Sequence, residues 1–337
     1  MDITDVSLFT LTQITFKTMK KVKFLVPALF VATAFSFSSC TEDEDDDIIV
    51  EESNIVELAQ GNADLSSLVA AATRAGLVDE LSDENANLTV FAPTNAAFAA
   101  FLSANGFSSV DEVPVDLLTQ ILLNHVVGAE VKAADLSTGY VSTLATFGTT
   151  TANLSLYVDL TSGVMLNGGP MVVTADVDAS NGVVHVIDEV IALPTIVTHA
   201  LANPNLSILV QALTRPDLTT DFVSILSGAG PFTAFAPTNY AFVALLAELG
   251  VASLNDIPVA TLEAVLTYHV ASGNVRAGAL TEGQIVTTLN TGTFTIGLAG
   301  GAKITDANNR VANIVATDVQ GANGVVHVID KVILPEL

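Results

Sequence analysis

The sequence is poor in cysteine, tryptophan and basic residues. A single cysteine in 337 residues cannot form a disulfide within the chain, so a disulfide-stapled fold is excluded. Eleven Lys and Arg stand against 36 Asp and Glu, a formal net charge of −25. This balance argues against a nucleic-acid partner, because phosphate recognition draws on clustered bases. With no tryptophan and four tyrosines, the chain has few side chains on which a sugar ring could stack.

The chain is instead rich in apolar residues. Half of its residues are hydrophobic and only 14% are charged, which predicts packed cores rather than global disorder. Its length corresponds to about two domains of roughly 150 residues each.

The N-terminal stretch has the pattern of an export signal. From Met19 the chain reads MKKVKFLVPALFVATAFSFSSC, with a basic start, an apolar stretch and small residues before Cys40. The apolar stretch contains Pro27 and is short for a bilayer span of about 20 residues. We therefore predict a secretory signal over residues 1–39, with Met19 as the true start and the preceding residues as a mis-started extension.

Cys40 follows this signal directly. Ser38-Ser39-Cys40 resembles the lipobox of bacterial lipoproteins, which implies a lipid-modified Cys40, with an inconsequential free thiol as the alternative. The following TEDEDDD holds six acids in seven residues, which repel one another and stay solvated, so residues 40–53 are expected to form a tether. The run also resembles the acidic signals that send lipoproteins of some Gram-negative bacteria to the outer face of the outer membrane. A plain spacer is the alternative.

Beyond the tether the chain is a tandem repeat. TVFAPTNAAFAAF (89–101) matches TAFAPTNYAFVAL (233–245) at nine of thirteen positions, and NGVVHVID (181–188) returns letter for letter at 323–330. The period of about 140 residues is far longer than the 20 to 50 residues of a solenoid unit. Each copy should therefore be a domain with its own core, and we place the copies at 54–194 and 195–337.

Within each copy, helical patterns precede strand patterns. A helix capped by Asn62 or Asp64 and ended near Gly76, a short strand 88–92, and a helix after Pro114 are predicted in copy one. Thr94 and Asn95, with Thr238 and Asn239 in copy two, are suited to cap the helix that follows the strand. Thr-, Gly- and Val-rich strands fill the rest, which indicates an α+β fold.

Three ordered blocks, each present twice, carry a resemblance to a family. The TVFAPTN and TAFAPTN phrases, the NHV and YHV triplets, and the closing NGVVHVID strands resemble the signature blocks of the fasciclin domain. The resemblance covers residues 54–193 and 195–337 and implies two tandem wedges of β-strands with packed helices, used for adhesion and matrix contact rather than catalysis. Copy one has Asn124 where the family commonly has a tyrosine, which copy two keeps as Tyr268.

The resemblance also implies contact positions. In animal members an acidic-aliphatic pair before the closing block, and the Tyr-His region, are linked to integrin binding. The candidate partner-binding residues in this chain are Asp176, Val177, Asp318, Val319 and Tyr268.

The histidines of the repeated blocks are predicted to be structural. In NGVVHVID, Val183, His185 and Ile187 alternate with Val184, Val186 and Asp188, so both faces of the strand are mostly apolar. A buried imidazole there needs hydrogen-bond partners, since an unpaired buried polar group costs about 1 to 3 kcal/mol. His125, His269 and His327 follow the same logic, whereas His199, in the junction between the copies, is expected to be an exposed linker residue.

Other chemistry finds little support. DVDASNG (176–182) is similar to the start of a calcium loop, but Ile187 stands where the bidentate Glu is required. The five histidines lack zinc-ligand spacing, and no hydrolase elbow or phosphate loop is present. We predict no cofactor, no metal and no catalytic residue.

The leading hypothesis is a lipid-anchored, exported surface protein that adheres to a protein or matrix polymer. The anchor would lie in the cell envelope, with the outer membrane as the expected site. A glycan-binding accessory lipoprotein is the alternative, and a hydrolase comes last.

Overall fold

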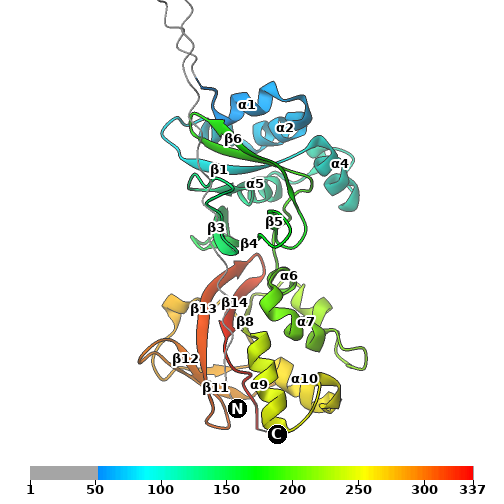
Figure 1. Cartoon of the computed structure of the whole chain (residues 1–337), viewed down its shortest axis with the longest axis vertical. Coiled ribbons are helices and arrows are strands. Elements are labelled where there is room, and N and C mark those ends of the chain that lie inside the picture. Colours follow the sequence, from blue (N-terminus) through cyan, green and yellow to red (C-terminus); the bar gives the residue numbers. More distant parts are fainter. Residues whose placement is uncertain (1–51, 337) are drawn as a thin grey trace, which may run out of the picture. The chain divides into compact units, whose positions relative to one another are not determined.

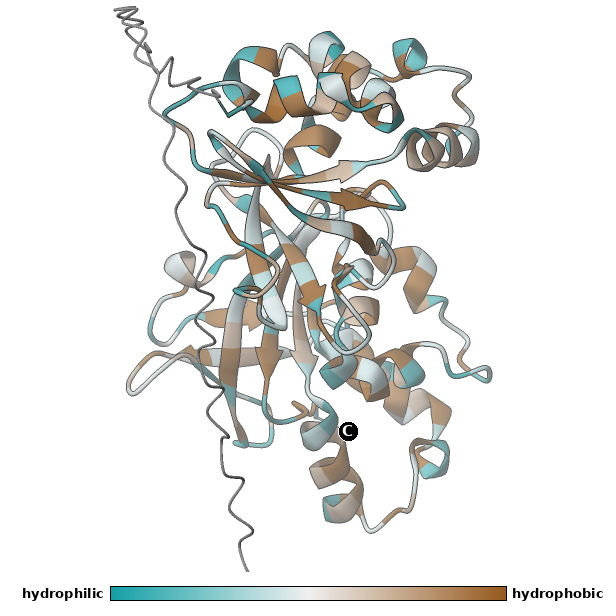
Figure 2. Cartoon of the chain, turned by 45° about the horizontal axis from the view of Figure 1, so that its top comes forward, coloured by the Kyte–Doolittle hydropathy of each residue, from teal (hydrophilic) through white to brown (hydrophobic). Residues whose placement is uncertain are grey.

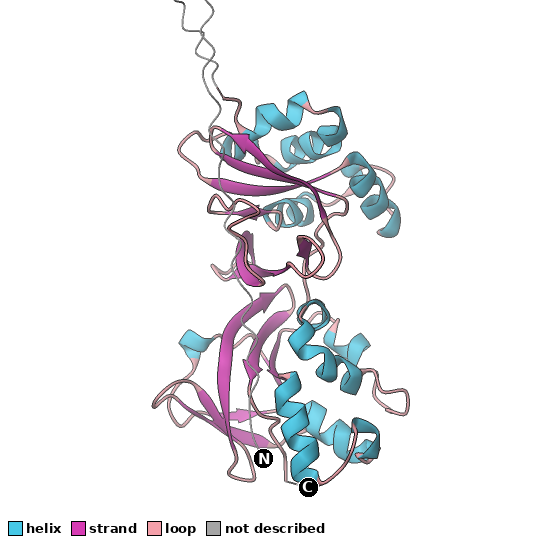
Figure 3. Cartoon of the chain, viewed as in Figure 1, coloured by secondary structure: helices cyan, strands magenta, loops and turns pink. Residues whose placement is uncertain are grey.

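The structure of the chain is a computed structural model that describes residues 52–336. The predicted signal, lipidation at Cys40 and most of the tether lie outside these residues. Both copies of the repeat belong to one compact unit, Val50–Leu337. Each copy has most of its helices in its first half and most of its strands in its second half. Figure 3 shows the helices and strands of both copies by colour, and the predicted α+β class is confirmed.

Copy one runs from α1 to β7 (Figure 1). Its helices are α1 Ile55–Gly61, η1 Ala63–Leu65, α2 Ser66–Ala75, α3 Val78–Leu81, α4 Asn95–Ala104, η2 Val110–Glu112 and α5 Val115–Leu123. Its strands are β1 Leu88–Pro93, β2 Val126–Val127, β3 Gly139–Thr146, β4 Asn153–Asp159, β5 Met165–Leu166, β6 Val172–Ala179 and β7 Gly182–Ile187. They form one sheet of order β2-β1-β7-β6 and another of order β3-β4-β5.

Copy two repeats this order with one larger sheet. Its helices are α6 Ile196–Ala202, η3 Pro204–Leu206, α7 Ser207–Leu213, α8 Phe222–Leu226, α9 Asn239–Leu249, η4 Leu254–Asp256, α10 Val259–Tyr268 and η5 Ala277–Ala279. Its strands are β8 Phe232–Pro237, β9 Val270–Ser272, β10 Ile285–Thr287, β11 Thr293–Gly297, β12 Lys303–Thr305, β13 Val311–Gly321 and β14 Gly324–Ile329. The strand order is β10-β11-β12-β13-β14-β8-β9, because β13 is long enough to pair with β12 at one end and β14 at the other.

The repeated octet forms the strand at the centre of each copy. β7 pairs parallel with β1 and antiparallel with β6, and β14 pairs in the same way with β8 and β13. Val184 and Val186 pack into the cluster under the helices, while Ile187 packs into a second cluster with β4 and β5. The strand is therefore covered on both faces, as its alternation predicted. In Figure 2 many segments of the strands are brown, the colour of hydrophobic residues.

Each copy closes its own interior. Four apolar clusters are present in the described residues, and the buried members of each come from one copy only. Tyr140 of copy one is the partial exception, because it packs half-buried against a cluster of copy two.

Four α-helices were not predicted from the sequence, namely α1, α3, α6 and α8. α1 begins with a capping box in which Asn54 accepts from the backbone of Glu57 and the Glu57 carboxylate accepts in return. α6 uses Thr195 and Thr198 in the same way. The junction that was expected to be an exposed linker around His199 is thus a helix, and that expectation is wrong.

Candidate functional site

The Asn-Gly pair that opens the octet anchors the helices to the sheet. The Asn181 side chain accepts from the N–H of Ile55 (3.0 Å) and donates to the carbonyls of Leu81 (2.9 Å) and Asp83 (3.2 Å). Asn323 makes the matching bonds in copy two, from the N–H of Ile196 and to the carbonyls of Leu226 and Gly228. Such side-chain bonds satisfy backbone groups that the helix ends leave unpaired.

The glycine of each pair allows two backbones to come close. Gly182 has φ +144°, and a Cβ there would lie 2.0 Å from the carbonyl oxygen of Leu88. At Gly324, with φ +157°, the corresponding distance to the oxygen of Phe232 is 2.3 Å. Only glycine fits both the contact and the dihedral angle. The Asn-Gly pair therefore allows neighbouring strands to pack closely, in addition to forming the turn that the sequence predicted.

The histidine of the octet braces the neighbouring bulged strand. His185 is fully buried, its Nε2–H donates to the carbonyl of Val131 (2.9 Å), and its Nδ1 accepts from the N–H of Asp176 (3.2 Å). His327 is also fully buried and bonds Val275 and Asp318 in the same way, at 2.9 and 3.4 Å. Burial lowers the pKa of His327, so the ring is neutral at pH 7.

The second histidine pair ties a helix end to the segment after the octet. Nδ1–H of His125 donates to the carbonyl of Ile121 (2.7 Å), and Nε2 accepts from the N–H of Ile191 (2.9 Å). His269 does the same with Val265 and Ile333. Burial lowers the pKa of both rings to about 4. Both nitrogens of all four recurring histidines are thus occupied, as the structural reading of these residues expected.

The Thr-Asn pairs after β1 and β8 also serve the fold. Thr94 caps α4 by accepting from the N–H of Ala97, and Thr238 caps α9 in the same way. Asn95 does not cap that helix. Its amide reaches back to the start of α2, accepting from Ser67 N–H (2.8 Å), and Asn239 reaches α7 likewise.

The candidate partner-binding residues fall into two groups. Asp176 and Asp318 sit in the bulges of β6 and β13 with φ +58° and +59°, and their side chains are 40% and 25% exposed. Val177 is half-buried against the copy-one core. Val319 is 3% exposed within a core cluster, so its assignment as a contact residue is wrong.

Tyr268 requires the same correction. Its side chain is fully buried in a core cluster, its hydroxyl donates to the carbonyl of Thr293 (2.6 Å), and that oxygen accepts from the N–H of Ala307 (3.2 Å). A side chain packed in this way cannot meet a partner. The equivalent residue of copy one, Asn124, is also buried, and its side chain donates to the carbonyl of Ala192 (3.1 Å).

Sequence reasoning missed an exposed valine near each bulge. Val173 of β6 and Val315 of β13 occupy equivalent positions and are both 57% exposed. Each lies three residues before the bulge aspartate, so both copies display an apolar side chain and a carboxylate on the same strand segment. The repeat of valine over an offset of 142 residues was visible, but its exposure depends on the bulge and could not be read from the sequence.

His199 lies where the two copies touch within the compact unit. It is fully buried in α6, its Nε2–H donates to the carbonyl of Gln320 (3.1 Å), and its ring meets that of Tyr140 edge-on at 5.6 Å. Burial lowers the pKa of His199 to about 4 and raises that of Tyr140 to about 12. The Tyr140 hydroxyl donates to the carbonyl of His199 (3.3 Å), so the junction residue is structural.

The described part of the chain carries neither a cluster of metal-ligating side chains nor a membrane-spanning helix. Within residues 52–336, no group of three His, Cys, Asp or Glu side chains is placed to hold a metal ion. In the calcium-like stretch, Asp176 Oδ1 already accepts from the N–H of Ala133 (2.7 Å). No helix in the described part of the chain is long and apolar enough to cross a bilayer.

The blocks that recur are therefore the ones that build the fold, and comparison with known proteins places that fold. The fasciclin domain model matches residues 63–194 and 204–335. The chain belongs to the fasciclin family. It also resembles the solved FAS1 domain pair of the insect cell adhesion molecule fasciclin I, with a TM-score of 0.51, 21% identity, and coverage of 82% of this chain and 98% of that one.

Relatives by sequence include bacterial and animal proteins. Protein sll1483 of Synechocystis is 44% identical over 140 residues, which is 42% of this chain and 73% of that protein. The cell surface glycolipoprotein MPB83 of Mycobacterium bovis is 33% identical over 145 residues, 42% of this chain and 60% of MPB83. Human periostin is 30% identical over 253 residues, 74% of this chain, but the chain spans only 28% of periostin. Fasciclin domains thus occur in cell adhesion proteins.

Proposed function

We propose that the protein is a lipid-anchored adhesion protein of the cell surface, which contacts a surface or matrix protein through the bulged strands of its two fasciclin domains. The observation that carries this proposal is the valine and aspartate on the bulged strand of each copy: Val173 and Val315 are both 57% exposed, and the side chains of Asp176 and Asp318 are 40% and 25% exposed. Most other polar residues of the repeated blocks are used inside the fold, whereas these side chains keep surface area for a partner.

The chemistry of the pair favours a protein surface. An exposed valine offers apolar area, and the carboxylate three residues further along the strand offers an acceptor for a basic or amide side chain. Glu130, Asp176 and Asp178 lie around Lys132, whose ammonium is 2.8 Å from Asp178, so the copy-one patch is acidic overall. A bulged strand in each of two domains on one tethered chain would add avidity when both strands are engaged.

The lipid anchor is supported by Cys40 after the signal-like stretch and by the similarity to a glycolipoprotein of the cell surface. Replacing Cys40 with Ser is expected to move the protein from the membrane fraction to the soluble fraction. The measurement is membrane fractionation with an immunoblot, combined with protease shaving of intact cells to establish outward exposure. A C40S protein that stays with the envelope would contradict the anchor.

Binding is tested with a chain starting at residue 48 on paired protein and glycan arrays. Val173→Ser with Val315→Ser is expected to weaken protein binding by about tenfold, since a few central residues dominate an interface. Asp176→Asn with Asp318→Asn removes charge while keeping the acceptor for Ala133 and Ala277.

Val115→Ser is the matched control for these variants, because Val115 is 44% exposed and belongs to α5 and not to either bulged strand. All variants should unfold at the same urea concentration as the parent. Binding confined to glycans, or loss of protein binding in the Val115 control alone, would overturn the proposal.

A further inference from the structure

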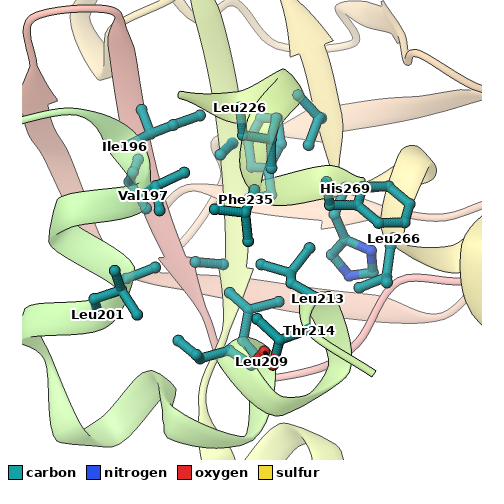
Figure 4. A pocket seen from close by; sticks show the side chains of 18 residues that line it. Ile196, Val197, Leu201, Leu209, Leu213, Thr214, Leu226, Phe235, Leu266 and His269 are labelled. Carbon is teal, nitrogen blue, oxygen red and sulfur yellow. Dashed lines mark hydrogen bonds between the residues drawn. The ribbon is translucent and has the colours of Figure 1, made fainter. Parts of the chain in front are cut away.

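Copy two contains an apolar cavity between its first helices and its sheet. The cavity has a volume of about 170 Å³. Its walls come from α6, α7 and α8 on one side and from β8, β9, β14 and α10 on the other, and Figure 4 shows the side chains around it. Leu201 and Val223 border the cavity and are 63% and 38% exposed, so it reaches the protein surface between α6 and α8.

The walls offer no hydrogen bond to an occupant. All lining residues are apolar except Thr214 and His269. The Thr214 hydroxyl donates to the carbonyl of Val210 (2.8 Å), and both nitrogens of His269 are bonded to backbone groups. An occupant is therefore held by apolar contact alone, which excludes a polar group from the interior because its hydrogen bonds to water would be lost.

The equivalent place in copy one is nearly filled. The cavity there measures about 30 Å³ and is lined by the matching residues of α1, α2, α3, β1 and α5. Val90 and Ala234 hold the same strand position, since they pair with Val184 and Val326 of the octet strands. In copy one the Val90 side chain fills space that the smaller Ala234 leaves empty in copy two. A second difference acts in the opposite direction, because copy two has Leu213 where copy one has Ala72, but the cavity of copy two is still the larger one.

The residue at the rim of the cavity also differs between the copies, and it is apolar in copy two. Leu201 is the sixth residue of α6, and the sixth residue of α1 is Gln60, which is exposed. An exposed leucine at the mouth costs solubility without a packing gain, whereas it suits the entry of an apolar group. At this place copy two thus combines the larger cavity with an apolar mouth, whereas copy one has a small cavity and a polar residue at its rim.

Size and charge define the class of occupant. An apolar cavity of about 150 Å³ stays dry and takes up benzene, so about 170 Å³ accommodates one ring or a short alkyl chain. None of the lining residues, all within residues 196–326, is charged. Arg215, next to Thr214, does not line the cavity and is bonded to Asp217 and to the carbonyls of Leu254 and Ile257. No basic side chain therefore lines this cavity to pair with an acidic head group.

We propose that copy two binds the apolar part of a small neutral molecule, a short alkyl chain or single ring, in this cavity. The polar end of the molecule remains in water at the mouth beside Leu201. This site is independent of the adhesion surface on β6 and β13, because the lining residues come from other elements.

The test uses the chain from residue 48, which contains all four core clusters, and follows the methyl NMR signals of Leu, Val and Ile. Addition of 1-hexanol or benzene is expected to shift the signals of Leu201, Leu209 and Val223 to saturation while the equivalent copy-one signals stay fixed. Hexanoate, of the same length but charged, should bind at least about tenfold more weakly, because a buried or bordering charge finds no partner.

Two variants make the result specific. Ala234→Val copies the filled state of copy one and should abolish saturable binding. Leu201→Gln copies the rim of copy one and leaves the interior intact, so it should weaken binding severalfold even where Ala234→Val perturbs folding. Binding that is unchanged in both variants, shifts spread equally over both copies, or no shift with any of the three compounds would each overturn the proposal.

Discussion

Asp178 of copy one and Gln320 of copy two hold the same position at the end of the bulged strand, in different surroundings. Asp178 is exposed and pairs with Lys132. Gln320 is fully buried, its N–H donates to the hydroxyl of Ser155 in copy one (3.0 Å), and its side-chain amide donates to the carbonyls of Gly321 and Gly324 (2.9 Å each). A charge is tolerated where the strand faces water, and an amide replaces it where the copies meet.

The same contrast extends through the molecule. Residues identical in both copies, such as the Asn-Gly pair and His185 with His327, make identical bonds inside the fold. Residues that differ, such as Val90 with Ala234 and Gln60 with Leu201, change the volume of the cavity and the polarity of its mouth. We infer that the repeated octet is retained for packing and that specific behaviour resides in the positions that differ or stay exposed.

Lowering the pH should produce the largest difference in stability between the two copies. Copy two buries His199 and His269, each with a pKa lowered to about 4, whereas copy one buries one such residue, His125. Because the unfolded chain binds these protons below about pH 6.5 and the folded chain only near pH 4, stability is complete above pH 6.5 and falls as the pH drops. Between pH 7 and pH 5 each histidine removes about 2 kcal/mol, so copy two should lose about 4 and copy one about 2.

Urea unfolding followed by methyl NMR signals of each copy measures this difference. Since burial of His199 is peculiar to copy two, His199→Leu should bring the acid sensitivity of copy two close to that of copy one. Equal pH dependence of the two copies in the parent chain would show that the buried imidazoles do not control it.

The glycine of the octet should be the most sensitive single position for stability at neutral pH. Gly182→Ala forces its Cβ against the carbonyl of Leu88 and is expected to cost copy one about 3 kcal/mol or more. Gly61→Ala is the matched control, because a Cβ there meets no heavy atom within 4 Å. A urea midpoint unchanged by the Gly182 substitution would refute the close-approach argument.

His185→Ala and His327→Ala should have smaller and similar effects, because each leaves one buried carbonyl and one bulge N–H without a partner. The expected loss is about 2 kcal/mol in either copy. The measurement is thermal unfolding together with binding to the protein identified on the array. A variant that keeps its melting temperature but loses binding would reassign the histidine to the contact surface.

Local sequence signals predicted the parts of the fold that depend on neighbouring residues. The alternation in the octet, the cap at Thr94 and the helix after Pro114 all follow from the spacing and side-chain chemistry of residues that are close in sequence. The environment of His199 could not be read in this way, because its burial depends on Gln320 and Tyr140, which are distant in sequence.

The candidate site was predicted less well for the same reason. Transfer of contact residues by family resemblance placed Val319 and Tyr268 on a surface, whereas packing against distant elements buries both. The exposed valines near the bulges and the cavity under α6 depend on strand geometry and on empty space, and neither leaves a periodic pattern in the sequence.

If each copy closes its own core with its own octet strand, hydrogen exchange of the Gly182→Ala chain should show damage to one copy alone. We expect amide protection at pH 7 to be lost in β1, β7 and α5 of copy one, while β8, β14 and α10 of copy two keep theirs. Simultaneous loss of protection in both copies would show that the chain folds around one shared core and would contradict the account.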